Sequence, residues 1–138
     1  MEDKTYRVFG YKGKQVRDQI HGEDVIGAML EFIHAPRAGD VYNLGGGRES
    51  NASLLECVDK IEARLGRRMR TEYVDQNRSG DHICYISDLT KFKSHYPNWR
   101  LRHRLDDIID QILAKELRES TAVSWDVPAV ASMGYSAR

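Results

Sequence analysis

The segment SNASLLECVDKIEARLG, residues 50–66, constrains the fold most, because it encodes a helix with a defined start, apolar face and end. Ser53 and Glu56 have the spacing of a capping box, in which each residue satisfies a backbone N–H of the other. Gly66 supplies the usual C-terminal stop. Between them, one face carries apolar side chains at helical spacing, and a partner surface must bury it. This face consists of Leu54, Val58, Ile61 and Leu65.

Strand-like and helix-like segments alternate along the rest of the chain. Alternating runs bounded by turn residues predict short strands, and apolar positions at helical spacing predict helices. The predicted strands are 6–9, 14–17, 41–44, 71–74 and 83–87, with 41–44 buried, and the predicted helices are 23–35, 88–96 and 105–119. This alternation predicts a mixed α/β fold over residues 1–119. Residues 120–138 are rich in small residues without periodicity, which predicts a flexible tail.

The charge balance and the apolar runs exclude several classes of protein. Basic and acidic residues number 21 each, so the chain lacks the basic excess of a general nucleic-acid binder. No apolar run is long enough to span a membrane, and the N-terminus has no apolar signal core. Cys57 and Cys84 lack metal-ligand spacing, and the histidines show no metal-like pairing with them. We therefore expect reduced thiols, a cytoplasmic location and no metal site.

A few polar residues stand at the ends of predicted elements rather than on solvated helix faces. Gln15 and Arg17 alternate on one strand, so their side chains point to the same side. Asn43 ends the next predicted strand, directly before Leu44 and three glycines, and Arg78 lies in the polar loop NRSGDH. Two arginines from separate segments suit a pyrophosphate, because each planar guanidinium matches phosphate oxygens. These residues are candidates for a phosphate-containing ligand.

The same residues also allow a purely structural interpretation. Arg17 could pair with Asp18 or Asp24, and Arg78 with Asp81. The run Gly45 to Gly47 fits neither of the usual nucleotide-loop patterns, so a tight turn is the better interpretation.

His21 stands just before a predicted helix. A lone histidine there is more often a structural hydrogen-bonding or capping residue than a catalytic base or a metal ligand. We therefore assign it a supporting role.

Several motifs in this order resemble the C-terminal part of the extended short-chain dehydrogenase/reductase (SDR) enzymes that act on nucleotide sugars. The motifs are GYKGKQVRDQIHGEDV, then VYNLGGG before a capped helix, then NRSGDHICYISDLTK and YPNW. Within that family the resemblance is strongest to the CDP-paratose 2-epimerases, also called CDP-tyvelose epimerases, and it covers roughly residues 6–119. The resemblance implies a substrate-binding lobe plus late elements of a Rossmann domain with an incomplete sheet. Residues 41–44 would belong to that sheet, and residues 14–17 and 71–74 to the substrate lobe.

The resemblance also implies roles for the polar residues. Arg17 and Arg78 match arginines that contact the diphosphate of the nucleotide sugar from opposite sides. Gln15 and Asn43 match positions that commonly line the nucleotide pocket. The expected supporting residues, which hold the Arg17 loop and the start of the helix, are Asp18, His21, Asp24 and Asp81.

The chain departs from the family in two respects. It has no glycine-rich dinucleotide loop, and none of its seven tyrosines has a lysine four residues later, as the catalytic Tyr-x-x-x-Lys requires. We therefore expect no catalytic residue here, and NAD, the family's cofactor, is not expected to bind fully to this chain alone. The resemblance implies a CDP-sugar-binding fragment, from a truncated gene, a split gene or an excised piece. Epimerisation at C2 would require a separate N-terminal NAD-binding half.

The alternative is a non-catalytic interaction or oligomerisation module derived from the same family. Without a Rossmann half, the apolar faces of the helices at 25–33 and 54–65 would lack a covering surface. Large exposed apolar patches mark interfaces, so this alternative predicts a homo-oligomer.

Overall fold

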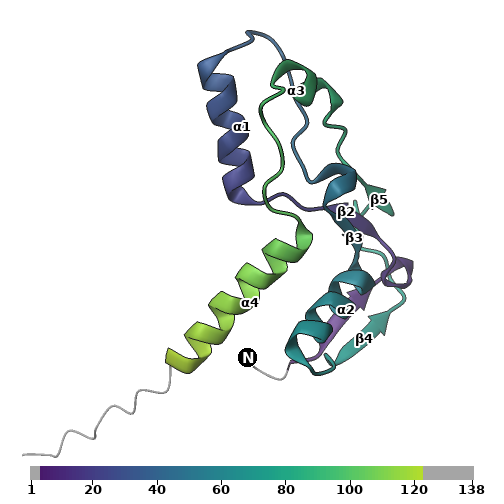
Figure 1. The fold of residues 1–138 in the computed structure, drawn as a ribbon. Coiled ribbons are helices and arrows are strands. Elements are labelled where there is room, and N and C mark those ends of the chain that lie inside the picture. The colour runs from purple at the N-terminus through teal and green to yellow at the C-terminus, as the bar shows by residue number, and fades with distance from the viewer. Residues whose placement is uncertain (1–3, 123–138) are drawn as a thin grey trace, which may run out of the picture.

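The computed structural model describes residues 4–122 and has the mixed α/β architecture that the sequence predicts (Figure 1). Small sheets and two helices form the lower part in that view, and two further helices with an extended segment form the upper part. The strands are β1 (Tyr6–Phe9), β2 (Val16–Asp18), β3 (Asn51–Ser53), β4 (Thr71–Val74) and β5 (Cys84–Tyr85). The helices are α1 (Gly22–His34), α2 (Leu54–Leu65), α3 (Thr90–His95) and α4 (Leu105–Ala122).

The strands form two small sheets rather than one. In the first sheet β1 pairs with β4 in parallel, although more than sixty residues separate them in the chain. In the second sheet β2 lies in the centre, antiparallel to β3 and parallel to β5. A tight 3-10 turn at Tyr11–Gly13 connects β1 to β2, and Tyr11 and Lys12 adopt positive φ there. The turn therefore sends the chain from one sheet into the other.

The two main helices begin and end where local sequence signals place them. At the start of α2 the Ser53 hydroxyl accepts the Glu56 N–H, and the Glu56 carboxylate accepts the Ser53 N–H at 2.7 Å. Gly66 ends this helix with φ 64°. The prediction of a capped helix here is confirmed. Helix α1 begins after His21, whose Nδ1 accepts the Glu23 N–H, so this histidine is the N-cap.

Two separate apolar clusters stabilise the two parts of the molecule. The upper cluster packs α1 against α3 and the segment after it, through Ala28, Leu89, Phe92, Tyr96 and Trp99. The lower cluster packs β3 against α4 through Ala52, Leu105 and Ile109. Polar contacts add to these clusters at the junction, where the Asp24 carboxylate of α1 accepts the N–H groups of Arg102 and His103, just before α4.

The prediction of a buried strand at residues 41–44 is wrong. This segment makes no strand ladder, and Val41 is 81% exposed. A strand needs a neighbour to accept and donate its backbone hydrogen bonds, and neither sheet of the described residues includes this segment. Tyr42 nevertheless fixes the segment to α3, because its hydroxyl lies 2.7 Å from Nδ1 of His95.

Other boundaries differ slightly from those the sequence predicts. Strand β5 has two residues instead of five. Helix α3 begins at Thr90, whose N–H is accepted by Asp88. Helix α4 extends to Ala122, and residues 123–138 of the expected tail lie outside the described part. Within residues 4–122 both cysteines are free, and no helix has the length and apolar character of a membrane span.

Candidate functional site

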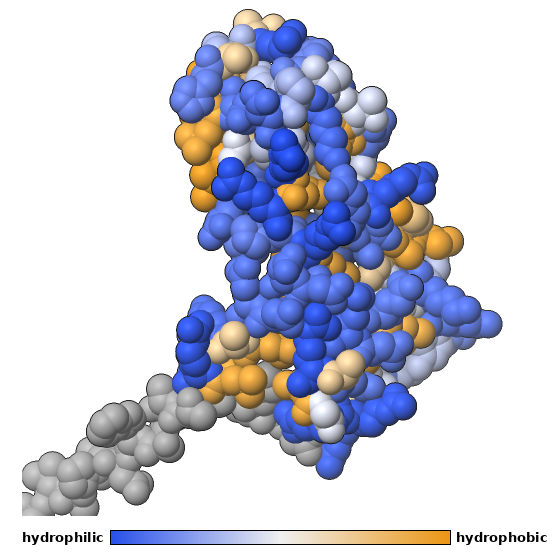
Figure 2. All heavy atoms as spheres, viewed as in Figure 1, coloured by the Kyte–Doolittle hydropathy of each residue, from blue (hydrophilic) through white to orange (hydrophobic). Residues whose placement is uncertain are grey.

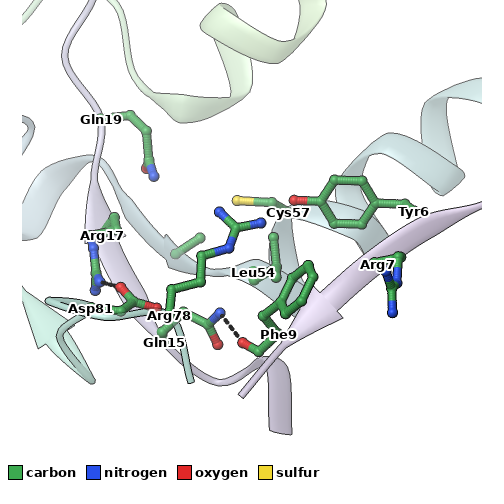
Figure 3. A pocket seen from close by; sticks show the side chains of 11 residues that line it. Tyr6, Arg7, Phe9, Gln15, Arg17, Gln19, Leu54, Cys57, Arg78 and Asp81 are labelled. Atoms are coloured by element: carbon green, nitrogen blue, oxygen red, sulfur yellow. Dashed lines mark hydrogen bonds and ion pairs between the residues drawn. The ribbon is translucent and has the colours of Figure 1, made fainter. Parts of the chain in front are cut away.

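A cavity of about 210 Å³ lies between the two sheets and the start of α2 (Figure 3). Its walls come from β1, β2, the first turns of α2 and the loop between β4 and β5. Three guanidinium groups and a single carboxylate line it, so the cavity is electropositive. The lining residues are Tyr6, Arg7, Phe9, Gln15, Arg17, Gln19, Ala52, Leu54, Cys57, Arg78 and Asp81.

Arg17 reaches the cavity from β2, the central strand of its sheet. One guanidinium nitrogen donates to the Val16 carbonyl at 2.7 Å, and the other forms an ion pair with Asp81. The Arg17 side chain is 34% exposed and that of Asp81 20%, so solvent screens the pair only in part. The structural interpretation of the sequence paired Arg17 with a neighbour in the chain, whereas its partner in the structure is 64 residues away.

Arg78 enters the same cavity from the loop after β4. Its guanidinium carbon lies 4.8 Å from the centre of the Phe9 ring, within the range of a cation–π contact. The aromatic ring positions the guanidinium without neutralising its charge. The alternative pairing of Arg78 with Asp81 is not formed, because Asp81 pairs with Arg17 instead.

Two glutamine side chains contribute buried polar atoms to the cavity wall. Gln15 donates from Nε2 to the Phe9 carbonyl at 3.1 Å, which fixes the orientation of its amide. Its Oε1 is buried without a hydrogen-bond partner, and so is Oε1 of Gln19. Sequence reasoning missed Gln19, although it continues the alternation of Gln15 and Arg17 and could have been found from that spacing.

The remaining candidates do not line the cavity, with the exception of Asp81. Asn43 is exposed on the irregular 40–44 segment. Asp18 accepts the N–H groups of Gly47 and Ser87 at 2.8 and 3.0 Å, and so joins the end of β2 to two other segments. Asp24 is buried in the first turn of α1. These acids bind backbone and do not reach the cavity.

The three glycines do not form a phosphate cradle. The N–H of Gly47 is already donated to Asp18, and a Cβ on Gly46 would lie 2.1 Å from the Gln19 carbonyl oxygen. Glycine is therefore required here for close packing of the chain on itself. Within residues 4–122, the Gly47 N–H is therefore not free to bind a phosphate of a dinucleotide.

Tyr42 has several polar neighbours but is not activated as a catalytic base. Tyr42 contacts His95 and lies 3.4 Å from Asp40, which in turn pairs with Lys91. Burial raises the pKa of Tyr42 to about 12, so its hydroxyl stays protonated at neutral pH. This group therefore acts as a structural hydrogen-bonding residue.

Comparison with known proteins gives sequence relatives over most of the chain. The chain is 34% identical over 116 residues to the low-salt glycan biosynthesis protein Agl12 of Haloferax volcanii. This match covers 82% of the chain and 36% of Agl12. The chain is also 30% identical over 91 residues to CDP-paratose 2-epimerase of Salmonella typhi. This match covers 64% of the chain and 26% of the epimerase. The chain thus spans only about a third of the length of these curated relatives. No protein-family model matches it.

Solved structures give a consistent result. The fold is similar to UDP-glucose-4-epimerase from Stenotrophomonas maltophila, solved with bound NAD and formylated UDP-arabinopyranose, with a TM-score of 0.72 and 28% identity. That match covers 86% of this chain and 36% of the epimerase. Several dTDP-glucose 4,6-dehydratases also match. The fold class expected from the sequence, a C-terminal portion of such an enzyme, is confirmed.

Proposed function

We propose that the cavity of this chain binds the diphosphate of a nucleotide sugar. The premise is that the chain is homologous to the C-terminal portion of the NAD-dependent nucleotide-sugar epimerases and dehydratases of the extended SDR family. One observation carries the proposal: Arg17 and Arg78 reach a single cavity from separate elements. Two planar forks facing one space match the oxygens of two linked phosphates.

The surroundings of the two arginines support this assignment. Asp81 now neutralises Arg17, so an entering diphosphate would replace a single carboxylate with a stronger anion. Arg78 rests on an aromatic ring and keeps its charge for the ligand. Phe9 and Leu54 add apolar surface beside these charges, as suits a ligand that also carries a flat base.

Among nucleotide sugars we propose CDP-sugars as the preferred ligands, because the sequence motifs resemble the CDP-paratose 2-epimerases most. The proposed role of these 138 residues is binding without turnover, since they contain no Tyr-x-x-x-Lys. Epimerisation at C2 with NAD would require the NAD-binding portion that this sequence does not include. The nucleotide half of the site is then the part that can be tested directly.

A cysteine in the cavity wall can report ligand binding through its reactivity. Cys57 lines it, whereas Cys84 is exposed on β5 outside it, and both thiols are free. Burial raises the pKa of the Cys57 thiol, so the thiol should react slowly but measurably at mildly alkaline pH. We expect millimolar CDP to slow alkylation of Cys57 severalfold and to leave Cys84 unaffected, as followed by peptide mass spectrometry.

Comparators define the ligand in this assay. CMP should protect less than CDP, because it has a single phosphate for two arginines, and UDP and dTDP measure the base preference. Equal alkylation of Cys57 with and without every nucleoside diphosphate would refute the binding proposal. Equal protection by CDP, UDP and dTDP would retain the diphosphate site and reject the CDP preference.

A second candidate function, self-association, rests on the outer face of α1. Four apolar side chains, spaced along one side of this helix, are unusually exposed. Figure 2 shows the corresponding hydrophobic surface along the side where α1 lies. They are Ile26 at 58%, Met29 at 56%, Leu30 at 49% and Ile33 at 68% exposure. A contiguous apolar stripe of this kind favours an interface.

Substitution of this stripe tests self-association. We expect the unmodified protein to sediment as a dimer or larger species at micromolar concentration, and Ile26→Lys to shift it toward the monomer. Ile112→Lys on α4 is the matched control, since Ile112 is 56% exposed but lies on another helix. A monomer for the unmodified protein, or equal effects of the two substitutions, would argue against this interface.

A further inference from the structure

Two histidines and a glutamate from segments far apart in the chain meet beside the start of α1. His21 and Glu23 flank the first residue of the helix, and His103 precedes α4. A ligand atom from each lies within 4.8 Å of the others. Nε2 of His103 is 3.7 Å from the Glu23 carboxylate, and the centroids of the two imidazole rings are 4.3 Å apart.

The two ring nitrogens of His103 have different surroundings. Nδ1 is buried without a hydrogen-bond partner and lies 3.6 Å from Oδ2 of Asp24, whose side chain is 1% exposed. If Nε2, on the side of Glu23, binds a metal ion, the proton of the ring is on Nδ1 and faces the Asp24 carboxylate. Metal-binding histidines have this arrangement: one ring nitrogen binds the metal, and the other ring nitrogen donates its proton to a carboxylate.

The donor set selects the class of ion. Two imidazoles and one carboxylate match Zn²⁺ and similar transition metals, whereas Mg²⁺ and Ca²⁺ prefer oxygen donors. The ligand atoms of a tetrahedral Zn²⁺ lie about 3.3 Å apart, so the 3.7 Å between His103 and Glu23 is close to this spacing, and the whole cluster, within 4.8 Å, must contract to bind the ion. Glu23 is exposed, so its side chain can make part of this adjustment. The carboxylates of Glu23 and Asp24 also offset the positive end of the α1 dipole.

We propose that His21, Glu23 and His103 bind one divalent transition-metal ion of the Zn²⁺ type, with Asp24 orienting His103. The ion would connect the start of α1 to the segment that leads into α4. His21 now caps α1 through Nδ1, at a long 3.2 Å. Metal binding at its Nε2 would move the proton to Nδ1, and the exposed Glu23 N–H would turn to water. The fourth coordination position would hold a water molecule.

Three variants remove one ligand each and spare the fold. Glu23→Gln changes an exposed side chain, and His103→Gln keeps its size. His21→Asn removes the imidazole but retains a good N-cap, so a loss of metal in this variant cannot be attributed to a frayed helix. His82→Gln is the matched control, because His82 is exposed and outside the cluster.

The experiment uses the full chain without a polyhistidine tag. One sample is dialysed against micromolar Zn²⁺ and its metal content is measured. A separate, metal-free sample is titrated with Co²⁺, and the visible absorption of a tetrahedral site is recorded. We expect one ion per chain, with affinity at least about tenfold weaker in each ligand variant and unchanged in His82→Gln. Absence of stoichiometric Zn²⁺ from the unmodified protein, or equal Zn²⁺ in the ligand variants, would overturn the proposal.

Discussion

Replacement of Asp24 by alanine is expected to lower the free energy of unfolding by about 2–5 kcal/mol, because it removes a buried carboxylate that satisfies two backbone donors. Its two oxygens accept the N–H groups of Arg102 and His103, each at 3.0 Å. The Asp24 backbone carbonyl also accepts the Trp99 indole N–H at 3.0 Å, a contact with the upper apolar cluster that alanine would retain. Denaturant unfolding measures the change.

Two further substitutions separate the buried charge from its position on the helix. Glu23→Ala removes an acid from the same helical turn, but Glu23 is 71% exposed at its side chain. Its loss should therefore lower the free energy of unfolding by only about 0.3–1 kcal/mol, the size of a favourable interaction with the helix dipole. Asp24→Asn keeps one oxygen acceptor and should fall between the two. If Asp24→Ala were no more destabilising than Glu23→Ala, the buried carboxylate would not hold the two parts of the molecule together.

The elements that the sequence predicts well are those encoded by neighbouring residues. The capping box at Ser53 and the glycine stop at Gly66 lie within one helix and need no partner. The strand segments near β1 and β4 were also found from local alternation. Their pairing was not, because parallel pairing across more than sixty residues leaves no mark in either segment. Residues 41–44 carry a strand pattern and still form none, since a strand also requires a neighbour.

The candidate site follows the same division. Gln15 and Arg17 could be found because alternation places them on one side of a strand. The pairing of Arg17 with Asp81 and the contact of Arg78 with Phe9 are tertiary facts, fixed by how two sheets meet. Sequence spacing also argued against a metal site. It could not bring His103 to His21, because 82 residues separate them.

Arg17→Ala and Arg78→Ala are expected to weaken nucleoside diphosphate binding by about 1.5–3 kcal/mol each, which corresponds to roughly 10- to 150-fold in Kd. Each substitution removes a charge-assisted fork that faces the cavity. Titration calorimetry with CDP measures the change. Arg68→Ala is the matched control, because this guanidinium is 89% exposed and lies outside the cavity. Its affinity should equal that of the unmodified protein.

Lysine substitutions distinguish a fork from a point charge. Arg17→Lys and Arg78→Lys retain the charge but lose the planar geometry, so they should recover only part of the affinity. The double alanine variant should lose less than the sum of the single losses, because both groups contact one ligand. Arg17→Ala also leaves Asp81 without its ion-pair partner, so the Tm of each variant must be compared with its affinity. Unchanged CDP affinity in folded Arg17→Ala and Arg78→Ala proteins would exclude the cavity as the diphosphate site, whatever the effect on stability.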